Sequence, residues 1–332
     1  MRGSTDGVLL GVDGGNTKTI ALVARAGGTV VGAGRVTRCG DPYAVGIDAA
    51  LDVIIAAAEE ALRSAGRPDV AAAGFSLAGA DWPEDVEELS AALGARWPSC
   101  RVVNDGIGAL RAAVPDGPGV VVALGTGAAT GARGADGRTW HTSFWQEPQS
   151  AHELGVLALQ AVYRAELGID PPTDLTGRIL DRLGETDVEA VLHRTTRRSA
   201  RPWGEHAILA SVLLDAAESG DPTAAAIVTR QGEALGRTAL AAARRVGIDG
   251  LPFPLALCGG VMRHPGRTLS DALVAAVRVG APGAWPLRPR LEPVVGALLL
   301  AFDAAGIPVP GPVEARLLAT LPPDTLFDTH PG

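Results

Sequence analysis

Short apolar runs alternate with glycine-rich turns at the start of the chain, which predicts strands rather than helices. Residues 8–12 lead into the turn Gly11–Thr19 and residues 20–23 lead out of it, so this segment predicts a β-hairpin. Residues 29–36 have the pattern of a third strand, and the alanine-rich segment 45–64 has that of a long helix. The chain therefore begins with three strands and a helix.

Strands and helices continue to alternate as far as a turn near residue 116. Residues 71–77 predict a buried strand. Asp81 and Pro83 predict the start of a helix, because an acid at the N-cap and a proline in the first turn suit a helix N-terminus. Residues 101–103 predict another short strand, and the turn at residues 115–118 is typical of a domain boundary.

The same pattern then starts again, since the apolar segment 120–124 runs into a second glycine–threonine turn at 125–131. The likeness of the two turns suggests a duplicated unit. Later segments are expected to be helices over about 151–246, with a solvated arginine-rich loop at 195–202, a strand at 255–258, helices at 268–279 and 293–301, and a loosely packed proline-rich tail after Pro308. Alternating strands and helices predict an α/β fold.

Composition indicates a folded chain with enough residues for two domains. The 332 residues are 47% hydrophobic and 20% charged, and the formal net charge is −8. The chain has no block of basic residues, which argues against a nucleic-acid partner. It has no apolar stretch long enough to span a bilayer and no signal-peptide core, so we expect a cytoplasmic protein with no membrane partner.

The cysteines give no sign of a metal centre. Cys39, Cys100 and Cys258 lie far apart and form no CxxC pair. The sequence therefore indicates no zinc site, disulfide framework or iron–sulfur cluster.

Candidate chemistry is concentrated in the first turn, which holds Lys18, the only lysine of the chain. Its glycines let the backbone approach a ligand closely, and its exposed N–H groups suit phosphate oxygens. Asp13 can hold a metal ion through water. An ordinary tight hairpin would show the same glycines, because short glycine motifs also arise by chance. The turn alone leaves both interpretations open.

Five segments in a set order extend this chemistry along the chain: residues 11–19, 104–106, 124–131, 257–264 and 293–300. Together they resemble the sugar kinase, Hsp70 and actin superfamily, and within it the N-acetylglucosamine kinase branch of the BadF/BadG/BcrA/BcrD ATPase-like proteins. In that order they resemble the first phosphate loop, the first connecting segment, the second phosphate loop, the adenosine segment and the second connecting helix. Residues 76–81 also resemble the sugar-pocket stretch. The resemblance covers about residues 8–305.

The resemblance implies two ribonuclease-H-like (actin-like ATPase) α/β domains with a nucleotide and substrate cleft between them. The first domain would span residues 1–113, with a helix at 293–306 returning to pack on it. The second would span residues 114–292, which leaves 307–332 as the proline-rich tail. Relatives are commonly dimers, so a homodimer is a further expectation.

The resemblance also implies ATP and Mg²⁺ as cofactors. Asp13 would organise the Mg²⁺ through water, and Lys18 would moderate charge on the transferred phosphoryl group. The residues expected at the nucleotide are Gly14, Gly15, Asn16, Thr17, Lys18, Gly125, Thr126, Gly127, Gly259, Gly260 and Met262. For the pair at 259–260 the alternative is a common turn after a buried strand.

Asp105 is expected to be the general base that takes the proton from a sugar hydroxyl. The alternative is that Asp105 caps the helix predicted at 106–113, and it can do both. The residues expected in the sugar pocket are Asp41, Ser76, Asn104, Asp105, Trp140, Gln146 and Glu147. Core packing is the default alternative for Trp140.

Two positions depart from the pattern of the family. The amino-sugar kinases have a Gly-Asp-Glu-Gly-Ser segment after the second phosphate loop; here its aspartate falls on Gln146, and its glutamate is kept as Glu147. A neutral amide still hydrogen-bonds a hydroxyl but is not a charged acceptor. Asp41 stands where the family often has asparagine. It either pairs with a free amine of the substrate or caps the helix near Val45.

The resemblance therefore implies an ATP-dependent kinase acting on a hydroxyl of N-acetylglucosamine or a related hexosamine, with a small-molecule amino sugar or polyol as its partner. One alternative is a kinase of glucosamine or of an aminocyclitol in secondary metabolism. Another is a non-kinase ATPase or nucleotide-binding module of the same superfamily. The scattered cysteines disfavour an activator of a radical dehydratase, and the absence of a cysteine-rich zinc motif disfavours the repressor/ORF kinases.

Overall fold

The computed structural model describes residues 7–199 and 206–327. Its strands form two five-stranded sheets. The first sheet contains β1 (Val8–Gly14), β2 (Thr19–Ala24), β3 (Val30–Val36), β4 (Val70–Leu77) and β5 (Cys100–Asn104). The second contains β6 (Gly119–Leu124), β7 (Ala128–Arg133), β8 (Thr139–His141), β9 (Phe253–Cys258) and β10 (Ala284–Leu287).

The two sheets have one topology. Their strand orders are β3-β2-β1-β4-β5 and β8-β7-β6-β9-β10. In each sheet the first three strands pair antiparallel, and the last two are added parallel to the first. The parallel additions follow helical connections, as a parallel crossover requires. The predicted α/β fold with two sheets is confirmed, and the shared order supports the predicted duplication.

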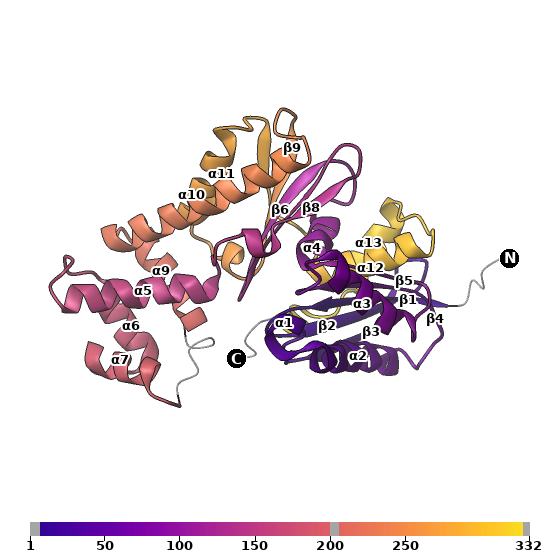
Figure 1. The fold of residues 1–332 in the computed structure, drawn as a ribbon, viewed down its shortest axis with the longest axis horizontal. Coiled ribbons are helices and arrows are strands. Elements are labelled where there is room, and N and C mark those ends of the chain that lie inside the picture. The colour runs from indigo at the N-terminus through magenta and orange to yellow at the C-terminus, as the bar shows by residue number, and fades with distance from the viewer. Residues whose placement is uncertain (1–6, 200–205, 328–332) are drawn as a thin grey trace.

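Helices cover both sheets and form an extension beyond the second one, at the left of Figure 1. They are α1 (Pro42–Val45), α2 (Ile47–Ser64), α3 (Pro83–Gly94), α4 (Asp105–Ala113), α5 (Ala151–Glu166), α6 (Leu175–Leu183), α7 (Val188–Thr196), α9 (Leu209–Glu218), α10 (Pro222–Arg245), α11 (Thr268–Arg278), α12 (Pro293–Ala304) and α13 (Gly311–Thr320). Among the described residues, none of the helices has the length and apolar character needed to cross a membrane.

Three local expectations need correction. The long helix predicted over 45–64 begins two residues later, as α2, because Gly46 with a φ of 84° separates it from the short α1, which contains Val45. The start of α3 is not capped by Asp81; instead, the carboxylate of Asp85 accepts hydrogen bonds from the backbone N–H groups of Asp81 and Trp82. The arginine-rich segment 195–202 lies partly outside the described residues, and its first two residues still belong to α7.

Neighbouring side chains of a strand point to opposite faces of a sheet, and helices cover both faces of the first sheet. Leu10 of β1 packs in a core with Ala57 of α2, whereas Leu9 packs in another core with Leu298 of α12. α12 lies so close to the sheet that a Cβ at Gly11 would stand 2.3 Å from the backbone nitrogen of Leu298. A segment that follows the second sheet in sequence therefore returns to pack on the first sheet.

The proline-rich tail is packed rather than loose, so that expectation is wrong for residues 311–327. Leu317 of α13 is fully buried, and Phe327 is 5% exposed. Both belong to the core that contains Leu22 of β2. The helical spacing of Val313 and Leu317 gives α13 an apolar side that covers this core.

α4 joins the two sheets. It contacts β6 and β7 of the second sheet as well as α12 on the first, and it lies between the two sheets in Figure 1. Its first residue is Asp105, so the candidate base stands where the two halves of the molecule meet.

Candidate functional site

The ends of strands from both sheets surround a cavity of about 180 Å³, which we call the nucleotide cavity. Asp13 at the end of β1 pairs in register with Ser76 of β4, and Asp105 directly follows β5. Gly125 follows β6 and Gly259 follows β9. Ligands of open α/β sheets bind beyond the carboxyl ends of the strands, and this cavity has that position in both sheets. Its wall includes the expected residues Asp13, Gly15, Asn16, Thr17, Lys18, Asp105, Gly125, Thr126, Gly127, Gly259 and Gly260.

The two glycine–threonine turns touch each other across this cavity. The hydroxyl of Thr17 donates a hydrogen bond to the hydroxyl oxygen of Thr126 over 2.9 Å. A Cβ at Gly127 would lie 3.2 Å from the side-chain nitrogen of Asn16. Residues of both turns therefore line one cavity, which is the arrangement needed to hold phosphate oxygens from two sides.

Lys18 is held by a part of the chain that no sequence motif indicated. Its ammonium group donates a hydrogen bond to the main-chain carbonyl of Phe327, and Phe327 also lines the nucleotide cavity. Arg35 holds the same segment through the carbonyls of Thr325 (3.0 Å) and Leu326 (3.1 Å). Desolvation and the nearby Arg35 lower the pKa of Lys18.

Asp13 is held in position by Ser76, whose hydroxyl donates to its Oδ1 over 2.9 Å. Desolvation raises the pKa of Asp13 to about 6, and the Ser76 hydrogen bond and the charge of Lys18 act against this rise. Ser76 is fully buried and lines neither the nucleotide cavity nor the second cavity beside it, which is described below. Its position is therefore that of a support for Asp13, behind the surface that a sugar would touch.

The surroundings of Asp13 fit a magnesium ion that arrives with a nucleotide. Within residues 7–199 and 206–327, no three His, Cys, Asp or Glu side chains are grouped as a metal cage. Mg²⁺ is usually held by one or two carboxylates together with phosphate oxygens and water, so it needs no such cage. The carboxylate of Asp13, beside the first glycine–threonine turn, would supply the protein's part of such a site.

Asp105 stands at the N-terminus of α4, where Asn104 is the N-cap and accepts a hydrogen bond from the backbone nitrogen of Gly106 over 2.9 Å. Asp105 Oδ1 accepts from the same nitrogen over 2.8 Å. The capping role is thus shared. Desolvation, followed by the charges of Asp13 and Asp81, raises the pKa of Asp105 to about 7. A base whose pKa lies near 7 is well matched to proton transfer at neutral pH.

The wall of the nucleotide cavity also includes Gly259, Gly260, Arg263 and Glu292. Gly259 has a φ of 93°, and a Cβ there would lie 2.4 Å from the carbonyl oxygen of Leu124, so only glycine fits. Arg263 and Glu292 form an ion pair at 3.1 Å. Two expected residues are absent from the wall: Met262 is buried in the core of the second sheet, and Gly14 is buried at the end of β1.

A second cavity of about 660 Å³, which we call the acceptor cavity, adjoins the first. The two share residues of both phosphate turns, among them Asn16, Thr17, Thr126 and Gly127. The other residues of its wall are Cys39, Asp41, Tyr43, Ala44, Ala128, Ser143, Gln146, Glu147, Pro148, Gln149, Ser150, Glu153 and Ala207. A molecule in the acceptor cavity would therefore meet a nucleotide at the two turns.

The predicted sugar-pocket residues Asp41, Gln146 and Glu147 all line the acceptor cavity. Asp41 is also the N-cap of α1 and accepts from the backbone nitrogen of Tyr43 over 2.9 Å, so the capping alternative is present as well. Burial, opposed by that hydrogen bond, raises the pKa of Asp41. The side-chain oxygen of Gln146 accepts from Thr142 over 2.8 Å, and Glu147 is exposed.

Asn104 and Trp140 line neither cavity among the described residues. The amide nitrogen of Asn104 donates to Asp81 over 2.8 Å. Trp140 packs against the core of the second sheet, with the guanidinium of Arg245 5.8 Å from its ring centroid, which is the packing alternative.

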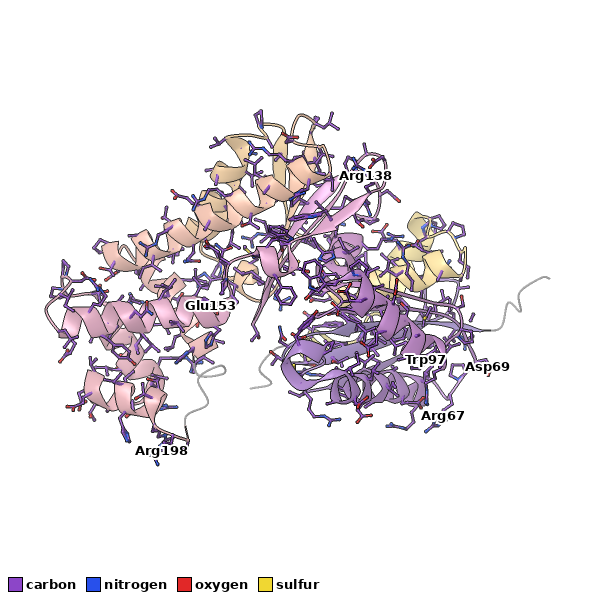
Figure 2. The ribbon with its side chains drawn as sticks, in the orientation of Figure 1. Arg67, Asp69, Trp97, Arg138, Glu153 and Arg198 are labelled. Atoms are coloured by element: carbon purple, nitrogen blue, oxygen red, sulfur yellow. The ribbon has the colours of Figure 1, made fainter. Side chains whose placement is uncertain are left out.

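The turn after β8 bridges the two halves of the molecule, and no sequence pattern indicated this role. Ser143 donates to the Oδ1 of Asp81 over 2.7 Å, and its φ of 43° is a strained value for a residue other than glycine. The acceptor cavity ends at the first turn of α5, where Figure 2 labels Glu153. Glu153 accepts from the backbone nitrogen of the N-cap Ser150 over 3.1 Å.

Known proteins resemble the chain over most of its length. A model of the BadF/BadG/BcrA/BcrD ATPase family matches residues 10–301. An N-acetyl-D-glucosamine kinase of Dictyostelium discoideum is 25% identical, with 90% of this chain and 98% of the relative covered. The crystal structure of a candidate N-acetylglucosamine kinase from Chromobacterium violaceum is 29% identical, with a TM-score of 0.70 over 90% of this chain and all of the other.

The fold is shared more widely than the sequence. A ROK family glucokinase of Streptomyces griseus, solved with glucose and AMPPNP, is 20% identical and has a TM-score of 0.59 over 90% of this chain and 100% of its own. Together with the two sheets of identical topology, these likenesses confirm the actin-like two-domain fold that the five segments indicated.

Proposed function

This chain belongs to the BadF/BadG/BcrA/BcrD ATPase family, and we propose that it is an ATP-dependent kinase of N-acetylglucosamine or a related hexosamine. The observation that carries the proposal is the meeting of two cavities at a pair of glycine–threonine turns, with Asp105 in the wall of the nucleotide cavity. The relatives that are N-acetylglucosamine kinases support the choice of acceptor.

In the proposed reaction, ATP occupies the nucleotide cavity with its phosphates between the two turns, and the sugar occupies the acceptor cavity. Asp105 takes the proton of the sugar hydroxyl while the hydroxyl oxygen forms a bond to the γ-phosphorus of ATP. The bond from that phosphorus to the β–γ bridging oxygen breaks, and ADP is released. Lys18 stabilises the charge on the transferred group. When bound, Mg²⁺ beside Asp13 supplies charge neutralisation and orients the phosphates.

Asp105 is ionised, and therefore active as a base, above a pH of about 7. The contact of Thr17 with Thr126 brings the two turns together, and exclusion of water from the closed cleft would strengthen these electrostatic interactions.

Several finer points form part of the proposal. The metal is Mg²⁺. The first domain comprises residues 1–113 and the helix at 293–306, and the second domain comprises residues 114–292. The protein acts as a homodimer in the cytoplasm. Light scattering at several protein concentrations tests the dimer, and replacing Mg²⁺ by a chelator tests the metal.

The experiment that tests the function is ADP release from Mg·ATP in the presence of hexoses, hexosamines, N-acetylhexosamines and aminocyclitols. Stimulation of release by N-acetylglucosamine, with a phosphorylated sugar among the products, supports the kinase. Release that no sugar stimulates, despite tight ATP binding, would instead identify a non-kinase ATPase of the same superfamily.

A further inference from the structure

Three consecutive main-chain carbonyl groups at the end of the described chain accept hydrogen bonds from two basic side chains of the first sheet. The guanidinium of Arg35 donates to the carbonyls of Thr325 over 3.0 Å and Leu326 over 3.1 Å. The ammonium group of Lys18 donates to the next carbonyl, that of Phe327. We call the three carbonyl-bearing residues the C-terminal turn. Arg35 and Lys18 are thus joined through one short piece of backbone.

The C-terminal turn lies against the sheet that carries both basic residues. The backbone nitrogen of Phe327 donates to the carbonyl of Asp324 over 2.8 Å and closes the 3-10 helix η3 (Asp324–Leu326). The ring of Phe327 is buried in the same core as Ile20 of β2, and Ile20 pairs in register with Arg35 of β3. Side chains directly opposite each other in an antiparallel pair lie on one face of the sheet. Arg35 therefore extends from the face that the turn covers.

Arg35 and Lys18 lie close together although both are cationic. Desolvation, and next the charge of Arg35, lower the pKa of Lys18. Like charges repel each other, and the carbonyl oxygens at the end of the 3-10 helix offset this repulsion because they carry partial negative charge. Lys18 and Phe327 line the nucleotide cavity, whereas Arg35 lines neither cavity. Arg35 is therefore placed to act on a bound nucleotide through the C-terminal turn and Lys18, and not by direct contact.

We propose that Arg35 is a positioning residue of the kinase. Arg35 fixes the C-terminal turn, and the carbonyl of Phe327 then fixes the ammonium group of Lys18 at the first glycine–threonine turn. A lysine has a flexible four-carbon stem and loses much rotamer freedom when it is ordered. Because Lys18 is held before ATP arrives, less of this entropy is lost on binding. The inference rests on the proposed function and adds to it a residue outside both cavities.

Arg35→Met removes both hydrogen bonds to the C-terminal turn and keeps an unbranched stem. It should lower kcat/KM for ATP by about three- to tenfold, with KM for the sugar unchanged, because Lys18 is no longer held at the phosphates. Arg35→Lys keeps a cation and should recover part of the loss. Arg316→Met is the matched control, since Arg316 of α13 also ties the C-terminal part of the chain to the first sheet, through the carbonyl of Gly27 over 2.7 Å, and lines neither cavity. Its kcat/KM should change by less than about twofold.

A double-mutant cycle with Lys18→Ala distinguishes positioning from a general structural role. In the Lys18→Ala protein, adding Arg35→Met should change kcat/KM for ATP by less than about twofold, because the group that Arg35 positions is gone. An equal loss in both backgrounds overturns the proposal, as does a loss in Arg316→Met as large as that in Arg35→Met. If Arg35→Met does not fold, Arg35→Gln, which keeps a polar head group, replaces it in the same cycle.

Calorimetric titration with a non-hydrolysable ATP analogue measures the same coupling without turnover. Arg35→Met should weaken binding of the analogue by about three- to tenfold when Lys18 is present, and by less than about twofold in Lys18→Ala. Unchanged binding in both backgrounds, with unchanged kcat/KM for ATP, also overturns the proposal. Absence of sugar phosphorylation by the wild type would refute the proposed function, and the titration would still decide whether Arg35 acts through Lys18.

Discussion

The ammonium group of Lys18 donates a hydrogen bond to the main-chain carbonyl of Phe327, which lies 309 residues further along the chain. The contact places the C-terminal segment of the described chain at the phosphate turn. The ring of Phe327 is buried in the core of the first sheet, and this packing fixes the position of the main-chain carbonyl of Phe327. An ammonium group has three N–H donors, and two of them remain for phosphate oxygens when one is held by Phe327.

Replacement of Lys18 tests its role at the phosphates. In Lys18→Ala the compact cation is lost from the turn, so kcat should fall and KM for ATP should rise together. Lys18→Arg keeps the charge on a larger, planar group and should recover activity only in part, because the turn is built for a point charge. Steady-state kinetics with varied ATP measures both effects. Full kcat with an unchanged KM for ATP in Lys18→Ala would remove Lys18 from the mechanism.

Replacement of Asp105 separates binding from chemistry. Asp105→Asn preserves the shape and the hydrogen bond to Gly106 but cannot take a proton. Turnover should fall by roughly 10²–10⁴-fold, the usual contribution of a general base, while nucleotide binding stays near normal. Single-turnover kinetics and titration with an ATP analogue measure the two quantities. Turnover equal to that of the wild type would assign Asp105 to helix capping alone.

Asp105 should also make stability depend on pH. Its folded-state pKa of about 7 lies above 3.8, the usual value for an aspartate, so between these pH values the folded state binds more protons than the unfolded state. The free energy of unfolding should therefore fall as pH rises through that window, and the whole penalty should be present above pH 7. Asp105→Asn removes the ionisation and should have a higher Tm than the wild type above pH 7. The difference should vanish near pH 4, and thermal unfolding at a series of pH values checks both limits. A Tm difference that does not vary with pH would contradict this origin.

The contact of α4 with α12 should tolerate no side chain at Gly296. A Cβ there would lie 1.9 Å from the carbonyl oxygen of Gly108, which belongs to the helix that carries Asp105. Gly296→Ala should therefore lower the free energy of unfolding by about 1–3 kcal/mol or more through overpacking, despite the better helix propensity of alanine. Denaturant unfolding measures this change.

Gly177→Ala is the matched control for that measurement. Gly177 lies within α6, and a Cβ there would have no neighbouring atom within 4 Å. The same substitution should raise stability by about 0.5–1 kcal/mol, because alanine is the better helix former. Equal effects at both glycines would show that α4 and α12 can move apart. The close contact of the two helices would then not be what holds Asp105 in position.

Local sequence patterns predicted most of the elements. The hairpin around Lys18 follows from two apolar strands and a glycine-rich turn, and the strand that ends before Asp105 follows from a short apolar run. Local patterns were less reliable at element ends, where capping depends on side-chain geometry. The N-terminus of α3 shows this, since Asp85 and not Asp81 satisfies the first backbone donors.

For the candidate site, the sequence by itself determined which residues lie on the turns beside the strand ends, because period, glycine content and turn chemistry act over a few neighbouring residues. Asp13 and Lys18 were identified in this way, whereas Asp105 and Thr126 were assigned through the resemblance of their segments to the family, and the structure brings all four to one cavity. Only the tertiary structure decided which distant groups meet them. The carbonyl of Phe327 at Lys18 and the bridge from Ser143 to Asp81 depend on how remote segments pack, and contacts of that kind leave no periodic signal in the chain.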